Sequence, residues 1–275
     1  MTQITAADVN KLRKMTGAGM MDCKKALQES EGDFEKAIDY LRKKGQKVAA
    51  KRADKEANEG IVLAGTTADK AFGAVVMINC ETDFVAKNEE FQSFAAKVLE
   101  VALAQRCENL EALLAADLNG RNVGDNITDL VGKTGERMSV SAYEVVDAAN
   151  VAAYNHQGNR LATLVGLSKT GFDELGHEIA MQVAAMAPIA VDKEDVPQEV
   201  IEREIEIGKE QARQEGKPEE MLEKIAMGKL NKFYKESTLL NQEYIRDSKM
   251  TVGQHVQSKD KALQVSGFKR LMLGE

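Results

Sequence analysis

The N-terminal residues alternate apolar and polar side chains with a helical period. Val9 and Leu12 follow Thr5 at helical spacing, and Asp8 stands three residues after Thr5, a pattern close to a capping box. A loop at residues 16–19, Thr-Gly-Ala-Gly, then interrupts the period. The sequence therefore predicts a first helix that begins after Thr5 and ends at this loop.

Two more short helices follow the loop. The second is expected to begin at about Met20 and to bury Cys23 and Leu27. Asp33 can cap a third helix, which we expect to end at Gly45. Three short helices predict a small bundle with a thin core, of the kind that is only marginally stable alone.

The period changes to that of strands after residue 60. Apolar side chains fill residues 61–65 and 72–79, with a polar turn between them, which predicts a β-hairpin. Asn88 then caps a helix that we expect to cover this hairpin. The apolar face of the helix carries Phe91, Phe94, Ala95, Val98, Val101 and Ala102.

The next segment repeats the order of strands followed by a helix. Strands are predicted near residues 138–146, 150–154 and 161–167, and a helix from about residue 172 to 187, where Pro188 ends it. The fold class is therefore α+β, with two similar layers in which a helix covers an antiparallel sheet. An old internal duplication would explain the repeat.

A charged helical segment interrupts the last part of the chain. Residues 200–234 show a narrow apolar stripe, with Gly216, Lys217 and Pro218 dividing it into two arms. Because 21 of the 50 residues from 198 to 247 are charged, we expect a helical hairpin that projects into water with an antiparallel coiled-coil seam. The stripe consists of Ile201, Ile205, Leu222, Ile225, Leu230 and Phe233.

Composition is that of a cytoplasmic globular protein. The apolar run near residues 181–191 is too short and too interrupted to span a membrane, and the polar start, residues 1–10, is unlike a secretory signal. Three cysteines are too few and too widely spaced for a disulfide framework or a zinc site.

The net charge of −7 conceals a basic segment. Residues 42–55 contain seven Lys or Arg side chains against Asp54 alone, which suits a nucleic acid or an acidic protein surface. The simpler interpretation is a solvated helix end that runs into a linker. Because no aromatic residues are interleaved and the whole chain is acidic, we favour the simpler interpretation and expect no direct nucleic-acid binding.

The sequence contains no complete motif for a cofactor, a metal ion or an active site. Gly132-Lys133-Thr134 lacks the earlier glycine of a phosphate-binding loop, since Ile127 stands at that position. The histidines His156, His177 and His255 lie far apart and form no metal motif. Glu81 and Asp83 would suit acid–base work, but no nucleophile accompanies them. We expect no cofactor, no metal and no covalent catalysis.

Two places carry features of a docking surface. Gly17 and Gly19 let a loop approach another molecule closely, and Met20 and Met21 place adaptable apolar side chains beside it. The alternative is that both methionines pack partly inside. Phe84 lies between an acidic residue and an amphipathic helix; the residues alone favour a core position for it, with exposure as the alternative.

Three sequence strings resemble the elongation factor Ts family. The first is LRKMTGAGMMDCKKAL at residues 12–27, the second is ETDFVAKN at residues 81–88, and the third combines residues 240–242 with KMTVG at 249–253. Their order and spacing agree with the family as well. The resemblance covers nearly the whole chain.

The resemblance implies a specific domain plan. It implies a three-helix module like a ubiquitin-associated (UBA) domain at residues 1–55 and a first α/β core subdomain at residues 56–136. A second α/β subdomain would follow at residues 137–275, with an inserted coiled-coil hairpin at about residues 196–236.

The resemblance also implies a function. The family's partner is the GTPase elongation factor Tu in its GDP form, from which it promotes release of GDP during translation elongation without covalent chemistry. Residues that would disturb the partner's magnesium ion are Thr82, Asp83, Phe84 and Val85. Partner-binding residues would be Arg13, Met20, Met21 and His156, the last of which has a turn residue as its alternative interpretation. Self-association varies within the family, so it stays open for this chain.

Two other functions compete with nucleotide exchange. A binding adaptor would dock a protein through its first module without affecting nucleotides, and it would tolerate loss of the Phe84 ring. An enzyme would use Glu81 and Asp83 and would turn over a substrate alone.

Overall fold

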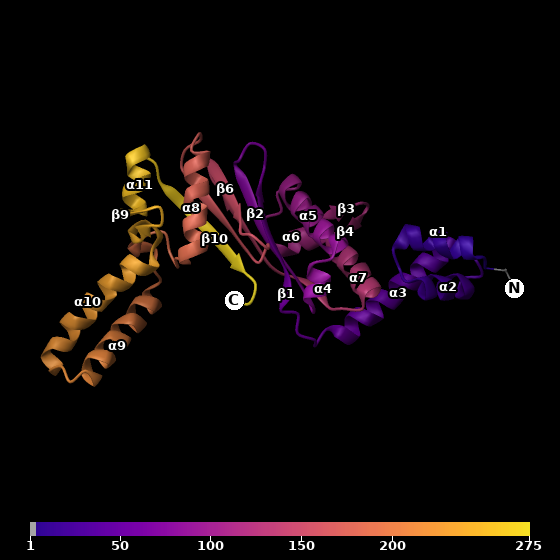
Figure 1. The fold of residues 1–275 in the computed structure, drawn as a ribbon, viewed down its shortest axis with the longest axis horizontal. Helices are drawn as coiled ribbons and strands as arrows, with labels where there is room; N and C mark the ends of the chain where they lie inside the picture. Colours follow the sequence, from indigo (N-terminus) through magenta and orange to yellow (C-terminus); the bar gives the residue numbers. More distant parts are fainter. Residues whose placement is uncertain (1–3) are drawn as a thin grey trace.

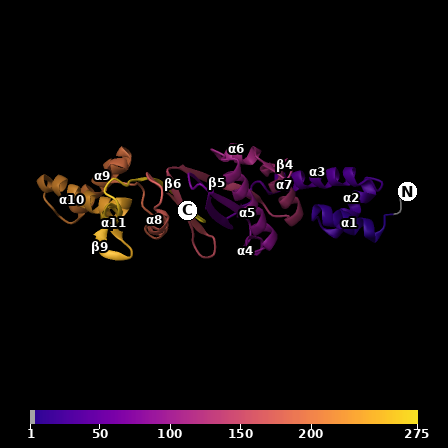
Figure 2. The same cartoon turned by 90° about the horizontal axis from the view of Figure 1, so that it is seen from above.

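The computed structural model describes residues 4–275, and the structured elements follow one another along an elongated molecule. In Figure 1 the N-terminal helices lie at one end, two sheets with their covering helices lie in the middle, and a helical hairpin forms the other end. Figure 2 shows the same order from above. The first three residues, part of the polar start considered above, lie outside the described residues.

Three helices form the predicted N-terminal bundle: α1 (Ala6–Thr16), α2 (Met20–Glu29) and α3 (Phe34–Arg52). Thr5 and Asp8 make the capping box at the start of α1, and Gly17 ends α1 in the left-handed conformation, with φ of 66°. The small core contains Val9, Leu12, Cys23, Ala26, Leu27 and Ala37, all buried.

The prediction that α3 ends at Gly45 is wrong, because the helix continues to Arg52. Gly45 is buried where α3 crosses α7 (Val123–Thr134). A Cβ atom on Gly132 of α7 would lie 2.7 Å from the Cα of Gly45, and one on Gly45 would lie 3.2 Å from the carbonyl oxygen of Thr128, so the helices are in close contact at both glycines. Here glycine permits a close helix–helix crossing instead of ending a helix.

The first sheet contains the predicted hairpin of β1 (Glu59–Thr66) and β2 (Phe72–Cys80), which pair antiparallel. Helix α5 (Glu89–Ala104) starts at the Asn88 cap and covers one face of this sheet, as predicted. Three elements that the sequence did not reveal complete this side: α4 (Asp83–Ala86), α6 (Leu110–Ala115) and α7. A two-residue ladder, β3 (Asp117–Leu118) with β4 (Arg121–Asn122), leads into α7.

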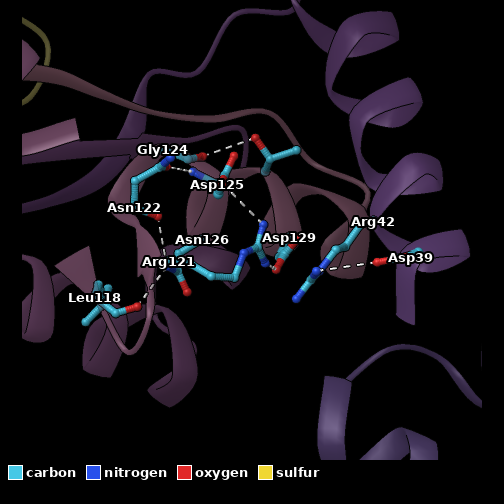
Figure 3. Close-up of polar contacts among 10 residues, drawn as sticks. Asp39, Arg42, Leu118, Arg121, Asn122, Gly124, Asp125, Asn126 and Asp129 are labelled. Atoms are coloured by element: carbon cyan, nitrogen blue, oxygen red, sulfur yellow. Dashed lines mark hydrogen bonds and ion pairs between the residues drawn. The ribbon is translucent and has the colours of Figure 1, made fainter. Parts of the chain in front are cut away.

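Helix α7 is anchored by polar contacts at its start (Figure 3). The side chain of Asn122 accepts a hydrogen bond from the backbone N–H of Asp125, and Arg121 forms ion pairs with Asp125 and Asp129. Figure 3 also shows Arg42 of α3, which is paired with Asp39, on the facing helix.

The three strands predicted for the second layer lie at the expected residues, but the first of them belongs to the first sheet. β5 (Met138–Asp147) pairs with β2 and completes the first sheet, in the order β1-β2-β5. β6 (Asn150–Asn155) and β7 (Leu161–Leu167) form the second sheet with β10 (Val265–Met272), a strand that the sequence did not reveal. The expectation that residues 138–146 share a sheet with the next two strands is therefore wrong.

The two sheets pack face to face and are covered by helices on their outer sides. Val62 and Val75 of the first sheet meet Val151 and Leu164 of the second in one buried cluster. Helix α8 (Asp173–Met186) agrees with the helix predicted from about residue 172 to 187, and it covers the outer face of the second sheet. Figure 1 shows α8 and α5 on opposite sides of the paired sheets.

The charged segment forms the predicted helical hairpin of α9 (Gln198–Gln214) and α10 (Glu219–Ser237). Its seam depends on small residues that the predicted stripe did not include: a Cβ on Gly208 would lie 3.1 Å from the Cα of Ala226. The chain then returns through β8 (Glu243–Tyr244), β9 (Asp247–Thr251) and α11 (Val252–Lys259) to β10. Two short 3-10 turns, Lys193–Asp195 and Leu239–Asn241, flank the hairpin.

The fold is thus a mixed α and β structure with small antiparallel sheets, which agrees with the predicted α+β class. Within residues 4–275, no helix combines the length and the hydrophobicity that crossing a bilayer requires.

Candidate functional site

The most exposed large apolar side chain of the described residues belongs to Phe84, which is 83% exposed. It lies on α4, a helix of a single turn between β2 and α5. On the same turn, Val85 and Ala86 are partly buried against the core of the first sheet. The core position that the residues alone favoured for Phe84 is therefore wrong. The neighbouring apolar side chains hold the turn in place while the phenylalanine ring projects into solvent.

Polar contacts from distant residues hold the start of α4. Thr82 caps the helix by accepting from the N–H of Val85, and its own hydroxyl donates to Glu136 Oε1 at 2.7 Å. The backbone N–H of Thr82 donates to the other oxygen of Glu136 at 3.1 Å. A four-residue helix has little stability of its own, so these contacts determine where Phe84 points.

Glu81, just before this cap, is engaged on both carboxylate oxygens. The backbone N–H of Arg137 donates to Oε1 at 2.6 Å, and Arg52 of α3 donates to Oε2 at 3.2 Å. Glu81 therefore fastens the end of α3 to the approach of α4.

Asp83 forms an exposed ion pair with Lys87, with 2.7 Å between Lys87 Nζ and Asp83 Oδ2. The hydrogen bond from Lys87 holds the pKa of Asp83 below its ordinary value, and the same bond raises the pKa of Lys87. Asp83 is thus a carboxylate at neutral pH. A general acid would need the opposite shift, so the lowered pKa gives no support to a general-acid role for Asp83.

The residues predicted to dock the partner near the N-terminus lie on the bundle. Met20 and Met21 begin α2 and are 54% and 75% exposed, so more of each side chain lies in solvent than the alternative that both pack partly inside would favour. Arg13 is also exposed, in the last turn of α1, where its charge is favourable. The loop at residues 16–19 separates Arg13 from the two methionines.

His156 lies exposed in the turn between β6 and β7. Its backbone N–H donates to the carbonyl of Leu161, and its carbonyl accepts from the N–H of Asn159. The Tyr154 hydroxyl is 2.9 Å from His156 Nδ1. His156 is therefore a turn residue, and its ring is also available at the surface.

The structure brings the β6–β7 turn and α4 to the same end of β1. The turn runs along β1: Asn155 at the end of β6 exchanges two hydrogen bonds with the backbone of Ala64, and the carbonyl of Asn159 accepts from the N–H of Val62. Arg160 then pairs with Glu59, the first residue of β1. Thr82 and Phe84 follow directly after Cys80, the strand partner of Glu59. Arg13, Met20 and Met21 lie apart from them, on the bundle at one end of the molecule (Figure 1).

The Gly-Lys-Thr string at residues 132–134, which resembles the end of a phosphate-binding loop, forms the C-terminal end of α7. Phosphate binding uses the N-terminal end of a helix, so this position supports the rejection of a phosphate-binding loop. Its lysine, Lys133, instead forms an ion pair with Glu90 in the first turn of α5.

Sequence reasoning missed Glu136 and the structural role of Lys133. Lys133 has no local signal and Glu136 has only a weak one, because each meets its partner only in the folded chain. The one clue for Glu136 was its place in a polar loop between a helix and a strand, where conformation-holding side chains are common.

Comparisons with known proteins point in one direction. A family model described as Elongation factor TS matches residues 81–275, which begin at the site itself. A relative from Amoebophilus asiaticus, named Elongation factor Ts, is 51% identical over 98% of this chain and 99% of its own. Relatives with the same name from Christiangramia forsetii and Cytophaga hutchinsonii are 50% and 52% identical, over 100% and 99% of this chain and 100% of each relative.

Proposed function

Because the chain belongs to the elongation factor Ts family, we propose that it is a guanine-nucleotide exchange factor of translation elongation, acting in the cytoplasm. It binds the GTPase elongation factor Tu in its GDP form and promotes release of GDP. The observation that carries the proposal is the exposed ring of Phe84 on a helix that is fixed by contacts at its start.

Burial of the Phe84 ring against the partner supplies a local driving force. Transfer of a phenylalanine side chain out of water is worth about 1.5–3 kcal/mol. Exposed aromatic residues on a rigid support are typical hot spots of protein interfaces. Because α4 is held by Glu136 and by the partly buried Val85, little of this free energy is lost in ordering the helix.

The proposed step is displacement of the partner's magnesium ion. Mg²⁺ requires near-octahedral oxygen ligands at short distances and neutralises nucleotide phosphate charge. Thr82, Asp83, Phe84 and Val85 press against the partner beside its nucleotide site. A small shift of the groups around Mg²⁺ then weakens GDP binding, without any covalent step in either protein.

The remaining predicted contacts provide affinity. Arg13, Met20 and Met21 contact the partner's GTPase domain, and His156 contacts the partner's third domain. By thermodynamic linkage, a factor that weakens GDP binding must itself bind more weakly when GDP is present. The complex is therefore tightest when the partner's nucleotide site is empty.

Release of a fluorescent GDP analogue from elongation factor Tu tests the proposal. The wild type should accelerate release, and Phe84→Ala should reduce the maximal acceleration by at least about tenfold while the other contacts keep most of the affinity. Met221→Ala is the matched control, because Met221 is also an exposed apolar residue but lies on the helical hairpin. Binding without acceleration by the wild type would indicate an adaptor instead.

A further inference from the structure

The two sets of predicted partner contacts lie on different hydrophobic cores. Met20 and Met21 belong to the bundle, whose core is formed by α1, α2 and the first half of α3. Phe84 belongs to the first sheet layer, whose core includes Val48 and Ala49 from the second half of α3. Helix α3 is the covalent link between these two parts. Simultaneous binding of one partner by both sets requires that their relative positions be fixed.

Helix α3 has a weak point between the two cores. Gly45 lies in the middle of the helix, and glycine is a poor helix former at which helices bend. The close crossing of Gly45 over Gly132 holds the helix axis at this point. Beside the crossing, however, a cleft of about 200 Å³ separates the bundle from α7, lined by Met15, Thr16, Ala18, Ile38, Leu41 and Lys133 among others. Packing alone therefore leaves the bundle incompletely supported on this side.

Lys133 lines this cleft on the α7 side. Its side chain leaves the last turn of α7, is only 25% exposed, and ends with Nζ paired to both carboxylate oxygens of Glu90. A Cβ atom on Gly17 would overlap Lys133 Nζ, so the loop at residues 16–19 rests directly on the lysine. One side chain thus touches the loop beside Met20 and is anchored at the first turn of α5.

Glu90 lies close to the Phe84 helix in the chain. Its backbone N–H is capped by Asn88, and Asn88 directly follows α4 and Lys87. The contact series runs from the loop at residues 16–19, through Lys133 and Glu90, to the segment that carries Phe84.

We propose that Lys133 is a positioning residue that fixes the loop at residues 16–19, and with it Met20 and Met21, relative to Phe84. The functional consequence rests on the proposed exchange function, but the positioning does not. Lys133 acts through its contacts with the loop and with Glu90. Removing it leaves the bundle supported by α3 and its crossing with α7, without the additional support of the loop, so the bundle and Phe84 engage the partner less cooperatively.

Distance measurements by pulsed electron paramagnetic resonance test the positioning directly. Spin labels attached at Lys25→Cys on α2 and Lys97→Cys on α5, both exposed positions, report on the two parts. The native cysteines Cys23, Cys80 and Cys107 are buried and their thiol pKa values are raised by burial, so they resist labelling. Lys133→Met should broaden the distance distribution of the folded protein.

Arg121→Met is the matched control. Arg121 is also a basic residue of the α7 region with carboxylate partners, but those partners lie on α7 itself (Figure 3). The Arg121→Met variant should leave the distance distribution between the two spin labels unchanged. Lys133→Glu combined with Glu90→Lys, which restores the pair with reversed charges, should narrow the distribution again. A purely structural role would lower thermal stability without broadening the distances in the folded state.

Affinity for nucleotide-free elongation factor Tu provides the second measurement. Lys133→Met should weaken binding about tenfold, and most of this loss should disappear in a background that already carries Met20→Ala and Met21→Ala. An unchanged distance distribution in Lys133→Met, or an equal loss of affinity in Arg121→Met, would overturn the positioning role. A wild type that fails to accelerate GDP release would instead overturn the proposed exchange function and leave the distance result standing.

Discussion

Glu136 accepts two hydrogen bonds from Thr82, a residue 54 positions earlier in the chain. One comes from the backbone N–H and the other from the hydroxyl, so both carboxylate oxygens are used. Because Thr82 is the N-cap of α4, Glu136 fixes the beginning of the helix that carries Phe84. The position of an exposed aromatic ring therefore depends on a carboxylate in the loop before β5.

Replacing Glu136 by alanine should slow exchange more than it weakens binding. The variant leaves the Thr82 donors without their acceptor, which should cost about 1–3 kcal/mol in the free energy of unfolding and loosen α4. We expect GDP release to be slowed at saturating factor concentration, measured with fluorescent GDP, and denaturant unfolding gives the stability change. Glu136→Gln keeps one acceptor oxygen and should show a smaller effect; an exchange rate equal to that of the wild type in Glu136→Ala would contradict the role.

Local signals were sufficient for most helices and strands. The capping residues Thr5, Asp33 and Asn88 each begin the helix that they predict, because a cap is a contact between neighbours in the chain. The helix α4 escaped prediction because a single turn has almost no local pattern. Gly45 does not end its helix because it is there to admit the close approach of Gly132, which lies 87 residues later in the chain. Propensity does not contain such a tertiary contact.

Strand pairing and the candidate site also depend on contacts between distant residues that sequence patterns do not predict. β5 has the alternation of a strand, but nothing in residues 138–147 says that it pairs with β2. At the site, the residues of α4 could be named from a sequence string, whereas the exposure of Phe84 could not be obtained from its apolar character. The supporting Glu136 and Lys133 act through contacts over 54 and 43 positions, which periodicity does not detect.

Gly17→Ala should destabilise the bundle more than a glycine replacement at an equivalent helix end. Gly17 has φ of 66°, which disfavours alanine by about 1 kcal/mol, and its added Cβ would also displace Lys133. Gly135 ends α7 with φ of 76° but has no atom within 4 Å of an added Cβ. The difference in unfolding free energy between Gly17→Ala and Gly135→Ala, from urea titrations, isolates the contact with Lys133; equal losses would contradict that contact.

Glu178 should make the stability of the second sheet layer depend on acid pH. It pairs with Arg246 at 2.8 Å and with His255 at 3.0 Å, and its side chain is 14% exposed. Burial acts to raise the pKa of Glu178, but the hydrogen bond from His255 and the charge of Arg246 outweigh it and hold the pKa below its ordinary value. A carboxyl whose folded pKa is lowered stabilises the protein above its ordinary pKa of about 4.3 and loses this contribution as pH falls through the folded pKa.

Unfolding free energies at pH 7 and at acid pH check this dependence. Glu178→Gln should cost about 1–3 kcal/mol at pH 7, and the gap to the wild type should shrink as pH falls below about 4. Glu144→Gln is the control, because Glu144 pairs with Lys269 at an exposed position and should change stability by no more than about 1 kcal/mol. A gap that stays constant between the two pH values would show that Glu178 contributes through packing and not through its charge.

Alanine at Gly132 and at Gly228 should have opposite effects, although both glycines lie inside helices. At Gly132 the new Cβ would lie 2.7 Å from the Cα of Gly45, so α3 and α7 must separate, and overpacking of this kind costs about 1–3 kcal/mol. At Gly228 of α10 nothing lies within 4 Å of the new Cβ, and the higher helix propensity of alanine should add up to about 1 kcal/mol. Thermal and urea unfolding measure both changes.

Since α3 links the bundle to the sheets, Gly132→Ala should also shift the distance between labels on α2 and α5, which Gly228→Ala should leave unchanged. If Gly132→Ala stabilised the protein instead, α3 and α7 would tolerate a wider crossing. The close contact between Gly45 and Gly132 would then not be required for stability.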